Sequence, residues 1–226
     1  MRDPYFDRKE VSNSDLSALK KLLYGGIDFD PTHAYAFGTL IDCMITEPEK
    51  VNYFKKTVVG ESYQYLEEDF ERAKKMKIAF NKDEFAKLVL KHASFQHIAF
   101  QHAWPICYNG IEFKLDVRCK FDFFFPGWKI GGDIKSTASE TLDQFESACH
   151  YFDYFRSRAF YMDISGNEKD MLIGISKNNF KVFKISLDKN AQIGTKARDL
   201  YELGKQEYQD LAFKYWHLFD GFKLTA

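Results

Sequence analysis

The chain has 226 residues, of which 45% are hydrophobic and 29% charged, and its formal net charge is −1 at pH 7. These values are typical of an ordinary globular protein with a sizeable core, and they exclude a protein that coats nucleic acid through an overall basic field. They do not exclude a local basic cleft that binds nucleic acid. The four cysteines are scattered without a CxxC pair, which indicates reduced thiols rather than a disulfide framework or a zinc site.

The N-terminus lacks the apolar core of a signal peptide, and no uncharged apolar run approaches the length of a membrane span. We therefore expect a protein that is neither secreted nor membrane-bound, with a cytoplasmic location.

The first part of the chain is predicted to be helical. One helix begins at about residue 12, with Ser12 or Ser14 as its N-cap, and ends at Gly25-Gly26. A second helix spans about 32–45 and is almost entirely apolar apart from Asp42. An unpaired charge inside a buried helix costs several kcal/mol, so Asp42 either faces water or has a partner.

Between this helix and the first strands, residues 52–59 are either a strand or an irregular connector. A heavily charged helix is predicted at 62–77, and its acidic residues precede its basic ones, as the helix dipole favours. A short helix follows at about 82–91.

From residue 95 onward, the hydrophobic period changes to that of strands. We predict strands at 95–100, 104–108, 111–117, 119–125 and 128–136, with a hairpin turn at Asn109-Gly110. A helical region at 141–163, a hairpin of 171–176 with 180–185, and a long amphipathic helix at about 188–219 complete the chain.

This order of elements predicts an α/β (α+β) fold, in which a central mixed sheet is flanked by helices. We expect one domain over 1–226, consisting of a mainly helical N-terminal portion (1–92), a sheet core (93–187) and a C-terminal helix (188–226).

The most informative stretch is 131–137, with sequence GGDIKST. Asp133 and Lys135 are two residues apart, so on a strand they project from the same face. The Pro126-Gly127 turn signal places Asp122 level with Asp133 on a neighbouring strand, where side chains lie roughly 5 Å apart. Two carboxylates so close repel each other unless a cation lies between them.

Hard carboxylate oxygens suit Mg²⁺ or Mn²⁺, and a lysine beside such a site can orient the attacking water and offset charge on a phosphate. The alternative for Asp133 and Lys135 is an ordinary ion pair at a strand end. Asp116 is a rival of Asp122 as the first acid.

This stretch resembles the signature of the PD-(D/E)xK nuclease superfamily, in which an acid is followed by (D/E)xK on the next strand. Three segments resemble its exonuclease VIII (RecE-type) and phage recombination branch. Residues 11–16 are similar to the branch's S-x-S-x-L helix start, residues 38–48 to G-T-x-x-H-x-x-x-x-E-P, and residues 132–137 to x-D-x-K-T-T. The resemblance runs from about residue 10 to 165.

Two positions depart from the family pattern. Asp42 stands where the family carries a metal-contacting histidine, and Ser157 stands where it carries a glutamine four residues before a tyrosine, here Tyr161. Arg158, next to Ser157, could replace that lost contact by holding a DNA phosphate. Tyr161 is alternatively a core residue.

The resemblance implies a restriction-endonuclease-like core and a metal site. Asp42, Asp122, Asp133 and the Ile134 carbonyl would hold the ion, and Lys135 would position the nucleophilic water. The expected substrate-binding residues are Ser136, Thr137, Ser157, Arg158 and Tyr161.

The resemblance further implies a Mg²⁺-dependent DNA exonuclease that acts on double-stranded ends in phage or prophage recombination, in a bacterial or phage-infected cell. Its candidate partners, besides DNA, are a single-strand annealing protein and further copies of this chain. Two alternatives remain: a DNA-binding module weakened in catalysis, supported by Asp42 and Ser157, and an endonuclease or single-strand nuclease of the same superfamily.

Overall fold

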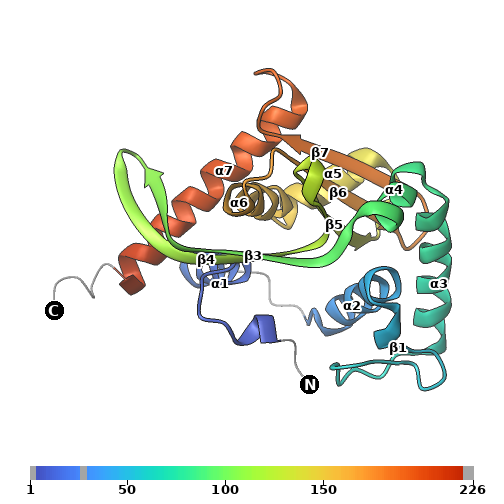
Figure 1. Ribbon diagram of the computed structural model, residues 1–226. Helices are drawn as coiled ribbons and strands as arrows, with labels where there is room; N and C mark the ends of the chain where they lie inside the picture. Colours follow the sequence, from blue (N-terminus) through green and yellow to red (C-terminus); the bar gives the residue numbers. More distant parts are fainter. Residues whose placement is uncertain (1–3, 26–29, 221–226) are drawn as a thin grey trace.

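The centre of the protein is a mixed sheet with helices on both faces (Figure 1). The computed structural model describes residues 4–25 and 30–220. The sheet contains, in spatial order, β3 (Ser94–Tyr108), β4 (Ile111–Phe125), β5 (Ile130–Thr137), β6 (Lys169–Ser176) and β7 (Val182–Asp188). β5 and β6 are parallel, and the other neighbours are antiparallel. The predicted fold class, a mixed sheet flanked by helices, is confirmed.

The helices form two layers. They are α1 (Asn13–Tyr24), α2 (Thr32–Thr46), α3 (Glu67–Lys82), α4 (Glu84–His92), α5 (Leu142–Tyr151), α6 (Tyr154–Ser165) and α7 (Lys196–Tyr215). Helices α2, α3 and α4 pack on one face of the sheet, and α5, α6 and α7 pack on the other, with α1 beside α7 (Figure 1). Within the described residues, no helix is long and apolar enough to cross a membrane.

Shorter elements join these layers. They are the 3-10 helices η1 (Pro4–Asp7), η2 (Pro48–Lys50) and η3 (Pro126–Trp128), the π-helical turn η4 (Trp216–Asp220), and a ribbon of β1 (Val51–Asn52) and β2 (Thr57–Val58). The ribbon occupies the segment 52–59, for which the sequence left a strand or a connector open.

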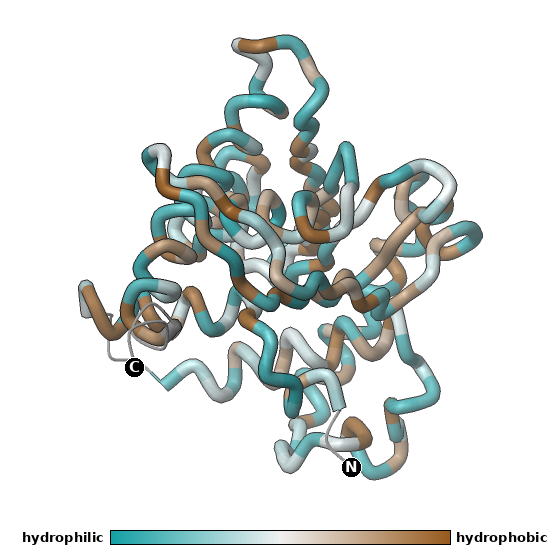
Figure 2. Tube along the Cα trace, turned by 60° about the vertical axis from the view of Figure 1, so that its left-hand side comes forward, coloured by the Kyte–Doolittle hydropathy of each residue, from teal (hydrophilic) through white to brown (hydrophobic). Residues whose placement is uncertain are grey.

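The hydrophobic pattern of β4 explains how the sheet is covered. In its first half, Phe113, Leu115 and Val117 are buried and the residues between them are exposed, as expected where one face meets water. From 117 to 125 every residue is at least half-buried, because helices cover both faces there. Figure 2 shows hydrophilic and hydrophobic residues alternating along the coils of the helices.

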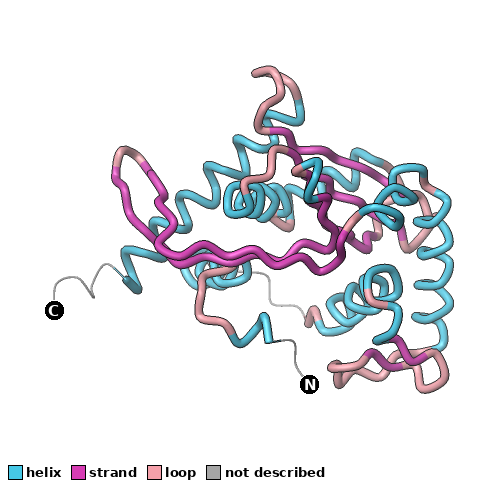
Figure 3. Tube along the Cα trace, viewed as in Figure 1, coloured by secondary structure: helices cyan, strands magenta, loops and turns pink. Residues whose placement is uncertain are grey.

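The hairpin of β3 and β4 corrects the predicted strand boundaries. The four strands expected at 95–100, 104–108, 111–117 and 119–125 are two continuous strands, whose arm extends beyond the rest of the sheet (Figure 3). The turn is where it was predicted, since Asn109 and Gly110 both have positive φ, at 50° and 79°. The expected gap after residue 100 is a β-bulge between Gln101 and Trp104.

Helix boundaries also differ from the prediction. The helix expected over 141–163 is divided into α5 and α6, because Asp153 adopts a left-handed conformation (φ 57°). The carboxylate of Asp153 forms ion pairs with Lys20 and Arg156, which stabilise this break. The helix expected from 188 begins at Lys196, since residues up to Asp188 pair with β6 as part of β7.

The charged helix predicted at 62–77 is α3, and the one predicted at 82–91 is α4, which Asp83 caps. Ser12, not Ser14, is the N-cap of α1, and Gly25 is its C-cap. Gly26 and residues 221–226 of the expected C-terminal portion lie outside the described residues.

Helices α6 and α7 approach each other closely at Gly204. A Cβ atom there would overlap the carbonyl oxygen of Phe155, whereas a Cβ at Gly38 in α2 would meet nothing within 4 Å. We expect Gly204→Ala to lower the free energy of unfolding by about 1–3 kcal/mol, since the backbone must move apart.

Gly38→Ala is the matched control, and it should raise stability by up to about 1 kcal/mol through helix propensity. Urea denaturation of both variants measures the difference. Equal stability of the two variants would contradict the close packing.

Candidate active site

The site lies where β4 and β5 separate. The two strands pair only from Phe123 to Phe125, opposite Gly132 back to Ile130, and β5 then continues alongside β6 alone. Asp122 is the first residue beyond this pairing, level with Asp133. Its Oδ2 accepts a hydrogen bond of 2.7 Å from the backbone N–H of Ile134. The carboxylate thus satisfies a strand amide that the separation leaves without a strand partner.

Two cations meet the carboxylate of Asp133. The Lys135 Nζ lies 2.5 Å from its Oδ2, and an Nη atom of Arg158 lies 3.0 Å from its Oδ1. Asp133 and Lys135 therefore share a strand face and an ion pair, as their spacing predicts. Arg158 comes from α6, on the sheet face that α5 to α7 cover.

A third carboxylate, Asp42, approaches from α2 on the other face of the sheet. The side-chain amide of Gln96, on β3, donates to Asp42 Oδ2 at 3.2 Å and to Thr46 Oγ1 at 3.0 Å. The Thr46 hydroxyl lies 3.2 Å from Asp42 Oδ1. The charge within the apolar helix thus has polar partners, which answers the question that its sequence raised.

Gln96 is a site residue that sequence reasoning missed. Its φ is 54°, a conformation that few residues other than glycine adopt, and it lies between the paired positions 95 and 97. This conformation sends the amide into the site instead of leaving the residue in the regular strand. Nothing in the local sequence marks this turn of the backbone.

Asp42, Asp122 and Asp133 line one cleft of about 980 Å³, together with Gln96 and Tyr161. Segments far apart in the chain form its walls, among them η1 and the loop after β2. Helix α2 and the strands β3, β4 and β5 therefore each contribute an acidic or amide group to a single hollow.

Asp116, the rival first acid, has another role. It is half-exposed, and its Oδ1 accepts the backbone N–H of Ala103 at 2.8 Å, with the His102 ring 2.7 Å away. Asp116 therefore holds the bulge of the β3–β4 arm and does not line the cleft. Among the two candidates, the geometry favours Asp122.

Mutual repulsion and burial change the acid strengths in the site. Burial raises the pKa of Asp42 to about 6, although the nearby Lys135 charge opposes this change. Burial, with the charges of Asp133 and Asp42, raises the pKa of Asp122 well above its usual value. Burial alone would lower the pKa of Lys135, but the carboxylates of Asp133 and Asp122 raise it above its usual range. Lys135 is therefore protonated here and offers positive charge and N–H donors.

The expected substrate-binding residues do not share one location, and not all of them line the cleft. Tyr161 is half-buried and lines the cleft, a position that fits both a substrate-binding residue and a core residue. The Thr137 hydroxyl is buried and bonds Ser139 at 2.8 Å. Ser136 lies on the strand face opposite Lys135 by alternation. The Ser157 hydroxyl donates to the carbonyl of Tyr154 at 2.9 Å, within its own helix.

Arg158 requires a correction. The sequence led us to expect that it holds a DNA phosphate, but the side chain is completely buried. Its guanidinium faces Asp133 and Asp170 at 3.0 and 3.1 Å. A charge enclosed in this way is not available to DNA, so Arg158 acts on the carboxylate of Asp133.

The donors of the cluster fit a hard divalent cation, because carboxylate oxygens are the ligands that Mg²⁺ and Mn²⁺ prefer. The buried Oδ2 of Asp133 also lacks an aligned hydrogen bond within the described residues. In their present arrangement, however, no three His, Cys, Asp or Glu side chains of the described chain converge closely enough to hold an ion. Instead, Lys135 stands against Asp133, as a cation drawn to a cluster of negative charge.

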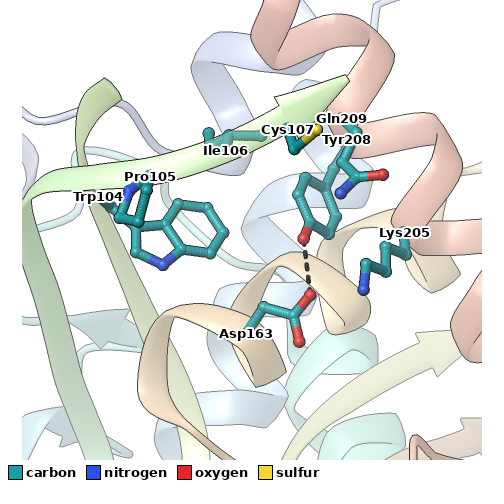
Figure 4. A pocket seen from close by; sticks show the side chains of 8 residues that line it. All are labelled: Trp104, Pro105, Ile106, Cys107, Asp163, Lys205, Tyr208 and Gln209. Carbon is teal, nitrogen blue, oxygen red and sulfur yellow. Dashed lines mark hydrogen bonds between the residues drawn. The ribbon is translucent and has the colours of Figure 1, made fainter. Parts of the chain in front are cut away.

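A second hollow, of about 290 Å³, lies between β3, α6 and α7 and does not share the residues of the cleft (Figure 4). Its one carboxylate, Asp163, accepts hydrogen bonds from the hydroxyls of Tyr208 at 2.6 Å and Tyr201 at 2.8 Å. Those bonds join α6 to α7. Asp163 is therefore explained by the packing of the two helices.

Comparison with known proteins places the chain in a family. Residues 8–217 match the model of a family described as "PDDEXK-like domain of unknown function (DUF3799)". This match confirms the predicted resemblance to the PD-(D/E)xK superfamily. No curated protein sequence matches the chain.

Two solved structures are similar to the chain at a low level. One is a phage-related exonuclease from Haemophilus somnus 129PT, with a TM-score of 0.38 and 9% identity over 91% of this chain and 96% of that one. The other is SSO0001, with a TM-score of 0.36 and 12% identity over 88% and 84% of the two chains.

The clustered carboxylates of the site are expected to lower the stability of the fold, because they repel one another. Asp122→Asn removes one of three neighbouring carboxylate charges and keeps an oxygen that can accept the Ile134 N–H. In EDTA at pH 7 we expect a gain on the order of 1 kcal/mol, and hence a thermal midpoint at least about 2 °C higher.

Asp116→Asn is the matched control, because that carboxylate is half-exposed and outside the cluster; its midpoint should change by less than about 2 °C. Differential scanning calorimetry measures both. A fall in the midpoint of the Asp122→Asn protein would show that Asp122 is not held in a repulsive cluster.

Proposed function

We propose that this chain, which belongs to the family of PDDEXK-like domains, is a metal-dependent nuclease that hydrolyses phosphodiester bonds in DNA. The observation that carries the proposal is that Asp42, Asp122 and Asp133 line one cleft, with Lys135 paired to Asp133. Asp122, Asp133 and Lys135 match the superfamily's signature in chemistry and order, and Asp42 stands at the position of the family's histidine. A structural ion pair needs two of them, not four.

Asp42, Asp122, Asp133 and the carbonyl of Ile134 would hold the ion, Mg²⁺ or Mn²⁺. When bound, such an ion lowers the pKa of water and neutralises charge on the phosphate. Lys135, protonated beside Asp133, donates N–H groups and positive charge to the attacking water and the phosphate oxygens. Gln96 holds the carboxylate of Asp42 in place from β3.

The charge of the cleft supports a role for metal in DNA binding as well as in chemistry. Its acidic lining residues are Asp42, Glu47, Glu61, Asp122 and Asp133, whereas Lys50 and Lys120 are its lysines. This excess of negative charge repels a phosphate backbone. A divalent cation held by the three aspartates would reduce that repulsion.

For the substrate, we propose double-stranded DNA ends, in phage or prophage recombination within a bacterial cell, on the resemblance to the exonuclease VIII branch. An annealing protein and further copies of the chain are the partners that this role implies. An endonuclease or single-strand nuclease, and a DNA-binding module without catalysis, remain the alternatives; the intact Asp122, Asp133 and Lys135 favour an enzyme over the binding module.

Substitution of the site should abolish hydrolysis. We expect Asp133→Asn and Lys135→Ala each to lower Mg²⁺-dependent DNA hydrolysis by at least about 100-fold, because each removes a charge that acts on the metal or the phosphate. EDTA should reduce the natural protein to the same level. Asp116→Asn, outside the cleft, should retain full activity.

The assay uses linear duplex, closed circular duplex and single-stranded DNA. Loss of linear duplex with intact circles supports the exonuclease, and cut circles or a preference for single strands supports the other two enzymes. DNA retention without hydrolysis supports the binding module. Full metal-dependent activity in the Asp133→Asn protein would disprove the assigned site.

A further inference from the structure

Arg158 forms a buried bridge between the cleft and the interior. Its Nε lies 3.1 Å from Asp170 Oδ1 on β6, and an Nη atom lies 3.0 Å from Asp133 Oδ1 on β5. Arg158 and Asp170 are 0% and 1% exposed. The cleft is lined by Asp133 but not by Asp170. Asp170 therefore acts on the site only through the arginine.

Aromatic rings hold the guanidinium in this position. Its carbon lies 4.3 Å from the centre of the Tyr161 ring and 5.2 Å from that of Phe121. Such cation–π contacts strengthen where water is excluded. With a carboxylate at each end and these rings beside it, Arg158 has no route to solvent. One oxygen of Asp133 consequently lies against a buried cation.

The charges of the buried cluster point to the number of ions that it accepts. When metal binds, its carboxylates are ionised. The four carboxylates of Asp42, Asp122, Asp133 and Asp170 then lie around two cations, Lys135 and Arg158. The two uncompensated negative charges equal the charge of one divalent ion. A second ion would leave an excess of positive charge in a site poorly exposed to water, which is costly.

We propose that Arg158, balanced by Asp170, restricts the carboxylate cluster to a single divalent ion by taking one oxygen of Asp133. This inference rests on the proposed metal-dependent function. The number of ions matters for a nuclease, because many enzymes of phosphate chemistry use two ions about 3.5–4 Å apart. Arg158 is thus a positioning residue, which acts through Asp133 without contacting the substrate.

The test counts Mn²⁺ ions bound to the full chain by isothermal titration calorimetry, with electron paramagnetic resonance of free Mn²⁺ as a second readout. The natural protein should bind one ion. In Arg158→Gln, the freed Asp133 oxygen and the lost positive charge should raise the number to two.

Arg156→Gln is the matched control. Arg156 is also on α6 and 1% exposed, but it bonds Asp153 at 2.8 Å and Ser17 at 2.6 Å, away from the carboxylate cluster. That variant should still bind one ion.

Loss of Arg158 leaves Asp170 without its counter-charge, and this could prevent folding. The double variant Arg158→Gln with Asp170→Asn removes both charges together, so it frees the same oxygen of Asp133 without leaving Asp170 charged and unpaired. It should also bind two ions, with circular dichroism confirming the fold.

Two ions in the natural protein, or one ion in both Arg158 variants, would overturn the inference while leaving the nuclease intact. No Mn²⁺ binding by the natural protein would overturn the proposed function and the inference together.

Discussion

The separation of β4 from β5 after only three paired positions is the constraint on which the site depends. It leaves the amide of Ile134 to the carboxylate of Asp122, and it opens the sheet so that groups from both layers of helices can meet there. Asp42 reaches this place from one face and Arg158 from the other. The carboxylates that meet there repel one another strongly, because the site is shielded from water. The other polar groups of the site are cations and hydrogen-bond donors that face these carboxylates.

Much of the fold was readable from the sequence, because local patterns determine it. The Asn109-Gly110 turn, the apolar runs of β4 and β5 and the helix after Ser12 each have a short-range cause. The core of the site was readable for a similar reason. Two residues on one strand face and an acid across a tight turn are placed by geometry. An acid such as Asp42 inside an apolar helix either faces water or has a partner, which marked it as a candidate.

The rest depends on packing between distant segments, which no local pattern reveals. The left-handed conformation of Asp153 divides a continuous helical pattern, and its carboxylate is stabilised by Lys20 from α1. Arg158 was expected at a DNA phosphate because it stands next to Ser157, where the family carries a glutamine. Its partner Asp170, however, is on a strand that the motif does not include. Gln96 gave no signal, since a single left-handed residue within an edge strand has no fixed sequence.

The two left-handed residues of β3, Gln96 and Ala103, have a consequence beyond the cleft. β3 is an outer strand of the sheet, and long regular outer strands invite pairing with other chains. At both positions the backbone departs from the regular spacing of amides and carbonyls that a foreign strand needs. The residue that orients Asp42 therefore also interrupts the edge along which a foreign strand would pair.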